Sequence, residues 1–278
     1  MLKLLIVEGN TAEQRRRHSE AGGRIAHELY TDVLRQIRSD LSFDFAFPAD
    51  GDSSLPSAAA LAAYDGIVWT GSALNIYNDG PEVERQIAFA RSCFRARVPQ
   101  FGSCWGLQVG VVAAGGEIAL NAKGREIGIA RKILLTKSGK SHALYRGKPP
   151  VFDALAVHKD GIAKLPDGAC VLSANAMGIQ ALSINFDGGE LWGVQYHPEY
   201  HFSEVASCMR RYAPNLIEEA LFSYQAEIDA AAAELATLDN SPSKRTQWCF
   251  GLEADILEPS MRRLELANWL AFVADAES

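Results

Sequence analysis

The sequence predicts an α/β protein whose central sheet is largely parallel. Short, continuous apolar runs occur at Leu2–Val7 and Gly66–Thr70, as is typical of strands buried on both faces of a parallel sheet. Segments with helical spacing of apolar residues follow them, at Ile25–Ile37 and Glu82–Arg95. Strands that alternate with helices in this way predict a parallel sheet covered by helices.

The rest of the first half continues this alternation. Pro81 suits the start of the Glu82–Arg95 helix, because the N–H that proline lacks has no partner in a first helical turn. Thr11–Gly23, with three consecutive arginines, is expected to be a long loop that is solvated, covers a site or binds an anionic partner. The further elements expected are a strand at Phe43–Phe47, a short helix at Leu61–Tyr64, a strand at Val98–Gly102 and a helix at Leu107–Ala114.

The second half changes character twice. From Glu126 to Gln195 we expect strands separated by turns, and after about Phe202 we expect helices. Trp248, Trp269 and the Leu264/Ala267/Leu270 spacing indicate helices packed on the preceding domain or on a second copy of the chain, which makes a homo-oligomer possible. The expected elements are strands at Ile127–Leu135, Ala169–Ser173, Ile179–Asn185 and Leu191–Gln195, a break at Pro214, helices at Leu216–Leu238 and Pro259–Val273, and a linker at Asn240–Ser243.

Composition excludes several classes of function. The chain has 278 residues, with 27 basic and 34 acidic side chains and a net charge of −7, which argues against a nucleic-acid partner. No apolar run approaches the length of a membrane span, and the first apolar run is too short for a signal peptide. The five cysteines are scattered without a C-x-x-C pair, so we expect no disulfide framework, no metal, no cofactor and a cytoplasmic setting.

Cys104 is the candidate nucleophile. It lies in Gly102-Ser103-Cys104-Trp105-Gly106, between an expected strand and an expected helix. A nucleophile at such a turn takes a strained backbone conformation, and flanking glycines let the strand and helix approach. The helix N-terminus is expected to lower the pKa of the thiol. The alternative is a tight turn that contains a merely buried cysteine.

His197 and Glu199 are the candidate partners of Cys104. They follow the expected strand Leu191–Gln195 within Gln195-Tyr196-His197-Pro198-Glu199, and strand C-termini carry the site in parallel-sheet folds. His197 would serve as general base and then general acid, while Glu199 would orient the imidazole. The alternative is a capped turn.

Backbone N–H groups are the candidates for an oxyanion hole. Gly71 follows the strand Gly66–Thr70, and a glycine there can point a bare N–H at the nucleophile. Trp105 follows Cys104 directly and would supply the second N–H. A plain loop glycine is the alternative for Gly71.

Together these motifs resemble the class I (triad-type) glutamine amidotransferases. The resemblance covers about residues 2–203 and is strongest to the glutaminase domain of GMP synthase and its stand-alone relatives. It rests on Cys104-Trp105-Gly106-Leu107-Gln108, the segments Arg125-Glu126-Ile127-Gly128 and Val157-His158-Lys159-Asp160, and the segment around His197. It implies a three-layer, flavodoxin-like fold with a largely parallel, mixed sheet. Residues 1–203 would form the catalytic domain and residues 204–278 a C-terminal helical extension.

The resemblance also implies roles. Cys104 would attack the glutamine carboxamide to give a γ-glutamyl thioester and ammonia, with His197 and Glu199 completing the triad. Gln108 and Glu126 would contact the substrate. His158 would support other residues of the site, and an ordinary loop histidine is the alternative. Two departures are Leu107, where a histidine is common, and Thr70-Gly71-Ser72 in place of Gly-Gly-Pro, which leaves the first oxyanion donor open by a residue or two.

Three functions follow as hypotheses. The first is a stand-alone amidotransferase or glutaminase, whose ammonia a separate synthetase subunit would receive, since the chain has no S-G-G-x-D-S pyrophosphatase loop. The second is a γ-glutamyl hydrolase or peptidase that uses the same triad. The third is a regulatory module that has kept the fold without activity.

Overall fold

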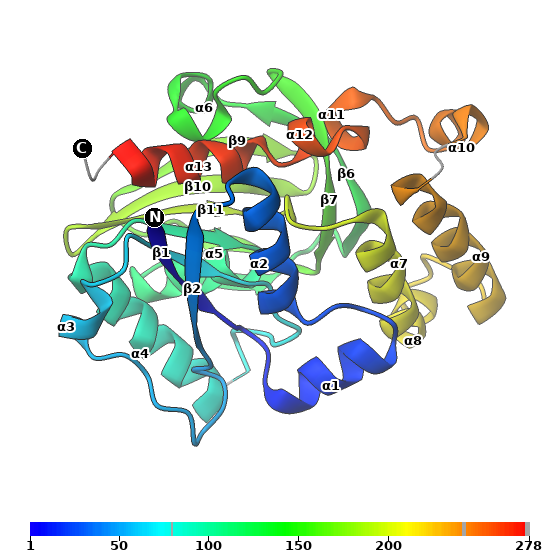
Figure 1. Cartoon of the computed structure of the whole chain (residues 1–278). Coiled ribbons are helices and arrows are strands. Elements are labelled where there is room, and N and C mark those ends of the chain that lie inside the picture. Colours follow the sequence, from blue (N-terminus) through cyan, green and yellow to red (C-terminus); the bar gives the residue numbers. More distant parts are fainter. Residues whose placement is uncertain (79, 241–242, 276–278) are drawn as a thin grey trace.

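A mixed central sheet organises the chain in the computed structural model, which describes residues 1–78, 80–240 and 243–275 (Figure 1). Within these ranges nine strands join it. They lie in the order β2 (Leu41–Ala46), β1 (Leu2–Val7), β3 (Gly66–Trp69), β4 (Gln100–Ser103), β11 (Gly189–Val194), β10 (Gly178–Phe186), β9 (Ala169–Asn175), β6 (Glu126–Leu135) and β7 (Val151–His158). The first five are parallel and the later pairings are antiparallel, so the predicted α/β class is confirmed.

Helices cover both faces of the parallel half. The side chains of β1 alternate between these two faces, since successive residues of a strand point to opposite sides of the sheet. Leu4 and Ile6 enter a core with α2 (Ala26–Ile37) and α13 (Leu264–Asp275). Leu5 and Val7 enter the opposite core with α4 (Pro81–Ala96) and α5 (Trp105–Ala113). The result is three layers.

The remaining elements lie around this centre. A third core joins α7 (Phe202–Arg211), α8 (Ala213–Glu218) and α9 (Gln225–Ala236) to Leu155 of β7. A separate antiparallel pair is formed by β5 (Glu117–Leu120) and β8 (Asp160–Lys164). The others are α1 (Ala12–Glu20), α3 (Ala58–Leu61), α6 (Lys137–Ser141), η1 (Ala143–Tyr145), η2 (Thr237–Asp239), α10 (Lys244–Cys249), α11 (Ala254–Leu257) and α12 (Pro259–Arg262).

The segment expected to be a loop at Thr11–Gly23 is instead a helix. Thr11 caps α1 in a capping box with Gln14, in which each side chain binds the other's backbone N–H. Arg16 pairs with Glu13 and Glu20 on the same helix. The expectation was wrong because none of the residues of α1 is buried, so an apolar pattern could not mark it.

Two C-terminal predictions also need correction. The long helix expected at Leu216–Leu238 is two helices, α8 and α9, and Ala220 between them adopts a left-handed backbone with φ 56°. The last helix divides likewise into α12 and α13. Of the linker expected at Asn240–Ser243, residues 241–242 lie outside the described residues.

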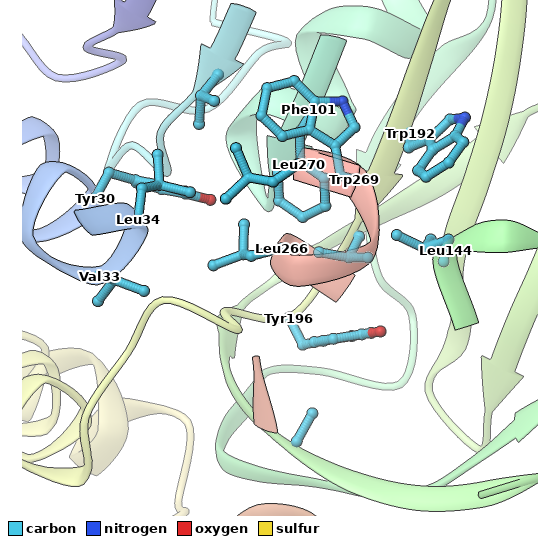
Figure 2. Packing of buried hydrophobic residues seen from close by; sticks show 14 of the residues in the cluster. Tyr30, Val33, Leu34, Phe101, Leu144, Trp192, Tyr196, Leu266, Trp269 and Leu270 are labelled. Atoms are coloured by element: carbon cyan, nitrogen blue, oxygen red, sulfur yellow. The ribbon is translucent and has the colours of Figure 1, made fainter. Parts of the chain in front are cut away.

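The buried face of α13 differs from the expected Leu264/Ala267/Leu270 spacing. Figure 2 shows Leu266, Trp269 and Leu270 within the core shared with α2. The Trp269 ring lies 6.0 Å from that of Phe101, and a Cβ on Gly66 would come within 2.8 Å of the Trp269 ring. The division of the chain at residue 203 stays a prediction, but α13 packs directly on the central sheet.

Among the described residues, no helix is both long enough and apolar enough to cross a membrane.

The two tryptophans of the C-terminal segment should differ sharply in their contribution to stability. Trp269 is fully buried, whereas Trp248 is 79% exposed. Trp269→Ala should lower the free energy of unfolding by about 3–5 kcal/mol through lost burial and a cavity. The control Trp248→Ala should change it by less than about 0.5 kcal/mol. Urea unfolding of both variants measures this, and equal losses would contradict the assigned packing of α13.

Candidate active site

Cys104 occupies a strained turn between β4 and α5. Its φ of 47° and ψ of −98° are unfavourable for any residue with a side chain. The Cys104 N–H donates to Val194 O at 2.7 Å, which ties the turn to β11. A Cβ on Gly102 would lie 2.7 Å from the Gly106 carbonyl carbon, and one on Gly106 would lie 2.5 Å from Trp69 Cβ. Both glycines are therefore needed for the close approach of strand and helix.

His197 lies beside this turn because β11 runs parallel to β4, with Val194 opposite Ser103. Its backbone N–H donates to Leu155 O at 2.8 Å. The ring stacks on Tyr200 with centroids 3.9 Å apart, and both Cys104 and His197 line one small cavity. The structure thus brings the predicted nucleophile and the predicted base together.

Glu199 completes the predicted trio and belongs to a longer network. His197 Nδ1 lies 2.7 Å from Glu199 Oε1, and both side chains are buried. The same oxygen accepts from Ser103 Oγ at 3.0 Å, and the Tyr30 hydroxyl donates to Ser103 Oγ at 2.6 Å. Sequence reasoning missed Tyr30 and Ser103. Ser103 lies inside the Gly102–Gly106 motif, but no local sequence pattern links Tyr30 of α2 to that motif.

Burial dominates the chemistry of the thiol. It raises the pKa of Cys104 to about 12, and the carboxylates of Asp160 and Glu199 add to the rise. The Trp105 backbone and the Gln195 side chain act against this rise by hydrogen bonding to the sulfur. The expectation that the helix N-terminus would lower this pKa overall is wrong, because desolvation outweighs it. A reactive thiolate therefore depends on transfer of the proton to a neighbouring base.

The predicted oxyanion donors lie close to the triad. A Cβ on Gly71 would come within 2.8 Å of His197 Cε1, so only glycine fits against the imidazole. Asn10 fixes this loop, with Nδ2 donating to Gly71 O at 3.3 Å and Oδ1 accepting from the Ala73 N–H at 3.0 Å. Trp105 begins α5, where an N–H has no partner in its own helix. Their role as an oxyanion hole stays a prediction.

A polar cavity of about 230 Å³ also reaches Cys104. Arg125 forms a two-point ion pair with Glu219 at 2.9 and 3.0 Å, and Lys159 joins the same carboxylate at 3.0 Å. Hydrogen bonding to Arg125 lowers the pKa of Glu219 to about 2. Asp160 accepts from the Tyr77 hydroxyl at 3.0 Å, and burial raises its pKa.

The two predicted substrate contacts are placed differently. Gln108, one turn after Cys104, lines this polar cavity. Glu126 lies behind His158, with Oε2 2.8 Å from His158 Nε2. Its oxygens also accept from Asn175 at 2.7 Å and Gln180 at 2.9 Å. Glu126 thus supports His158, and a direct contact with substrate stays a prediction.

The other four cysteines are free, and they lie outside the Cys104 turn. Cys93 and Cys208 are buried, Cys170 is half-buried and Cys249 is exposed. Over residues 1–78, 80–240 and 243–275, no group of three or more His, Cys, Asp or Glu side chains is placed to hold a metal ion.

Comparison with known proteins decides the family. The family model described as "Glutamine amidotransferase class-I" matches residues 46–210. The chain belongs to the class I glutamine amidotransferase family. Its chemistry is that of a cysteine amidohydrolase.

Individual relatives of this chain differ in how much of their length and sequence they share with it. It is 33% identical over 273 residues to a γ-glutamyl-L-1-hydroxyisopropylamide hydrolase of Pseudomonas sp., covering 97% of this chain and 92% of that protein. It is 36% identical over 141 residues to a GMP synthase of Leifsonia xyli, covering 50% of this chain but 26% of that protein. A solved glutamine amidotransferase from Thermotoga maritima shares the fold, with a TM-score of 0.67, 16% identity and coverage of 99% and 98%.

The reactivity of the Cys104 thiol should depend on His197. With the base replaced in His197→Asn, the raised pKa predicts a rate of alkylation by iodoacetamide that rises about tenfold per pH unit from neutral pH to about pH 10, without a plateau. The wild-type thiol should react faster at neutral pH because the imidazole accepts its proton. Peptide mass spectrometry follows each cysteine, and exposed Cys249 is the internal control. A plateau below about pH 9 in the variant would contradict the account.

Proposed function

We propose that this protein hydrolyses γ-glutamyl amides whose nitrogen carries a carbon substituent. Cys104 transfers its proton to His197 and attacks the γ-carbonyl carbon, which forms a tetrahedral intermediate. His197 then gives the proton to the leaving nitrogen, so that the C–N bond breaks and an amine departs from a γ-glutamyl thioester. Water, deprotonated by His197, cleaves the thioester to glutamate and restores the thiol.

The observation that carries this proposal is the charge pattern of the polar cavity beside Cys104. Arg125 and Lys159 share the single carboxylate of Glu219, which leaves one positive charge in excess. Asp160, held by Tyr77, supplies a negative charge in the same cavity. A γ-glutamyl group ends in an α-carboxylate and an α-ammonium, which match these two charges.

The length of the similarity favours a substituted amide over glutamine itself. The similarity to the γ-glutamyl-L-1-hydroxyisopropylamide hydrolase spans 97% of this chain, so it extends into the C-terminal helices. The match to GMP synthase spans 50% of this chain. That second similarity supports the other candidate, a glutaminase that passes ammonia to a separate synthetase subunit. A regulatory module without activity predicts no turnover of either substrate.

Product analysis separates these functions. The wild-type protein should release methylamine from γ-glutamyl-methylamide with a higher kcat/KM than ammonia from glutamine. Cys104→Ala should lower both by about 10⁴-fold or more, because the covalent path is lost. Cys93→Ala, a buried cysteine outside the site, is the matched control and should keep the activity. Release of ammonia but no methylamine would favour the glutaminase, and release of neither would contradict both enzymatic functions.

A further inference from the structure

A second, smaller cavity lies on the His197 side of Cys104. Its volume is about 40 Å³, and Cys104, Val157 and Tyr212 border both this cavity and the polar one. Cys104 therefore stands between two spaces of different character. The inference that follows rests on the proposed function and concerns the amine half of the substrate.

The direction of proton transfer decides which half of the substrate enters which cavity. The leaving nitrogen must receive its proton from His197, so its substituent points toward the imidazole. His197 lines the small cavity, whereas Gln108 and Asp160 line the polar one. We propose that the small cavity, called here the amine cavity, binds the carbon substituent of the leaving amine.

The walls of the amine cavity define the class of substituent. The apolar part of its lining is formed by Ala26 and Leu29 of α2, Cys208 of α7 and the ring of Tyr200. Its volume of about 40 Å³ is small beside the about 230 Å³ of the polar cavity. The substituent is thus a short alkyl or hydroxyalkyl group. An aromatic amine is too large.

Charged and polar side chains also line this cavity, among them Arg24 and Arg211, and the Arg211 guanidinium lies 5.6 Å from the centre of the Tyr212 ring. Arg24 is paired with Asp32 at its exposed end, and the Asn10 amide is engaged by Glu8, Gly71 and Ala73. His18 Nε2 lies 3.4 Å from Glu204. Because the lining residues include two arginines and no carboxylate, the cavity disfavours a substituent that carries a positive charge.

Helix α1 supplies the outer wall. His18 reaches Glu204 of α7, and the Arg24 N–H donates to both oxygens of that carboxylate at 3.2 and 3.1 Å. Figure 1 shows α1 lying beside the α7–α8 end of the molecule. His18 thus places α1 at the border of the amine cavity, where it limits the room for the leaving group.

Filling the amine cavity tests the proposal. Ala26→Leu should lower kcat/KM for γ-glutamyl-propylamide at least about tenfold more than for γ-glutamyl-methylamide, because the longer chain meets the new side chain. Cys208→Ala, which enlarges the same cavity, should shift the ratio of these two constants toward the propylamide. Ala88→Leu, at an exposed site on α4, is the matched control and should leave the ratio unchanged.

Each outcome is decisive. If either cavity variant changes the ratio in the expected direction while thermal unfolding stays cooperative, the amine cavity is supported. An unchanged ratio in both folded variants would overturn it, even if wild-type protein hydrolyses both amides. If the wild-type protein releases neither amine, the proposed function itself fails, which is a separate result from failure of the cavity.

Discussion

The strained backbone of Cys104 is the constraint on which the site depends. A residue with φ of 47° at the end of β4 keeps this unfavourable backbone conformation only if surrounding contacts hold it there. Three features supply these contacts: Gly102 packed on α5, Gly106 packed on β3, and the hydrogen bond from the Cys104 N–H to Val194 O. Together they present the thiol between two cavities and place the Trp105 N–H beside it.

A second set of contacts holds the residue next to His197, and one member of the set comes from the C-terminal helix α13. The Tyr196 hydroxyl, one residue before His197, donates to Glu265 of α13 at 2.6 Å. The carboxylate of Glu265 is paired with the buried Lys148 at 2.9 Å, and Tyr145 binds Tyr196 at 2.9 Å. A buried ion pair is costly to break by removing one partner, so this arrangement resists rearrangement. Helix α13 of the C-terminal segment therefore helps to hold the residue next to His197.

Features set by local pattern could be predicted from the sequence, and features set by distant contacts could not. The buried strands β1 and β3 and the turn around Cys104 were predictable, since continuous apolar runs and flanking glycines have direct physical causes. Strand β7 was not predicted from the sequence because Asp153 interrupts its apolar run. The structure satisfies that carboxylate with Arg131 and the Lys132 N–H, both at an irregularity in β6.

The candidate site divides in the same way. Cys104, His197 and Glu199 stand in recognisable motifs, whereas Tyr30 reaches the triad from α2 only through tertiary packing. The pKa of the thiol was mispredicted because helix-terminus effects can be read from sequence and burial cannot. Helix α1 was missed because a polar helix carries no apolar signature, although its capping box at Thr11 and Gln14 was visible.

The central claim is that Cys104 separates a charged cavity for the γ-glutamyl group from a small cavity for the leaving amine. A crystal structure of the protein inactivated by a glutamine-analogue diazoketone tests it most directly. The account predicts a covalent bond to Cys104 Sγ, with the amino-acid end of the adduct beside Arg125 and Asp160 and the amine cavity unfilled. An adduct on another cysteine, or an amino-acid end lying beside Leu29 and Tyr200, would contradict it.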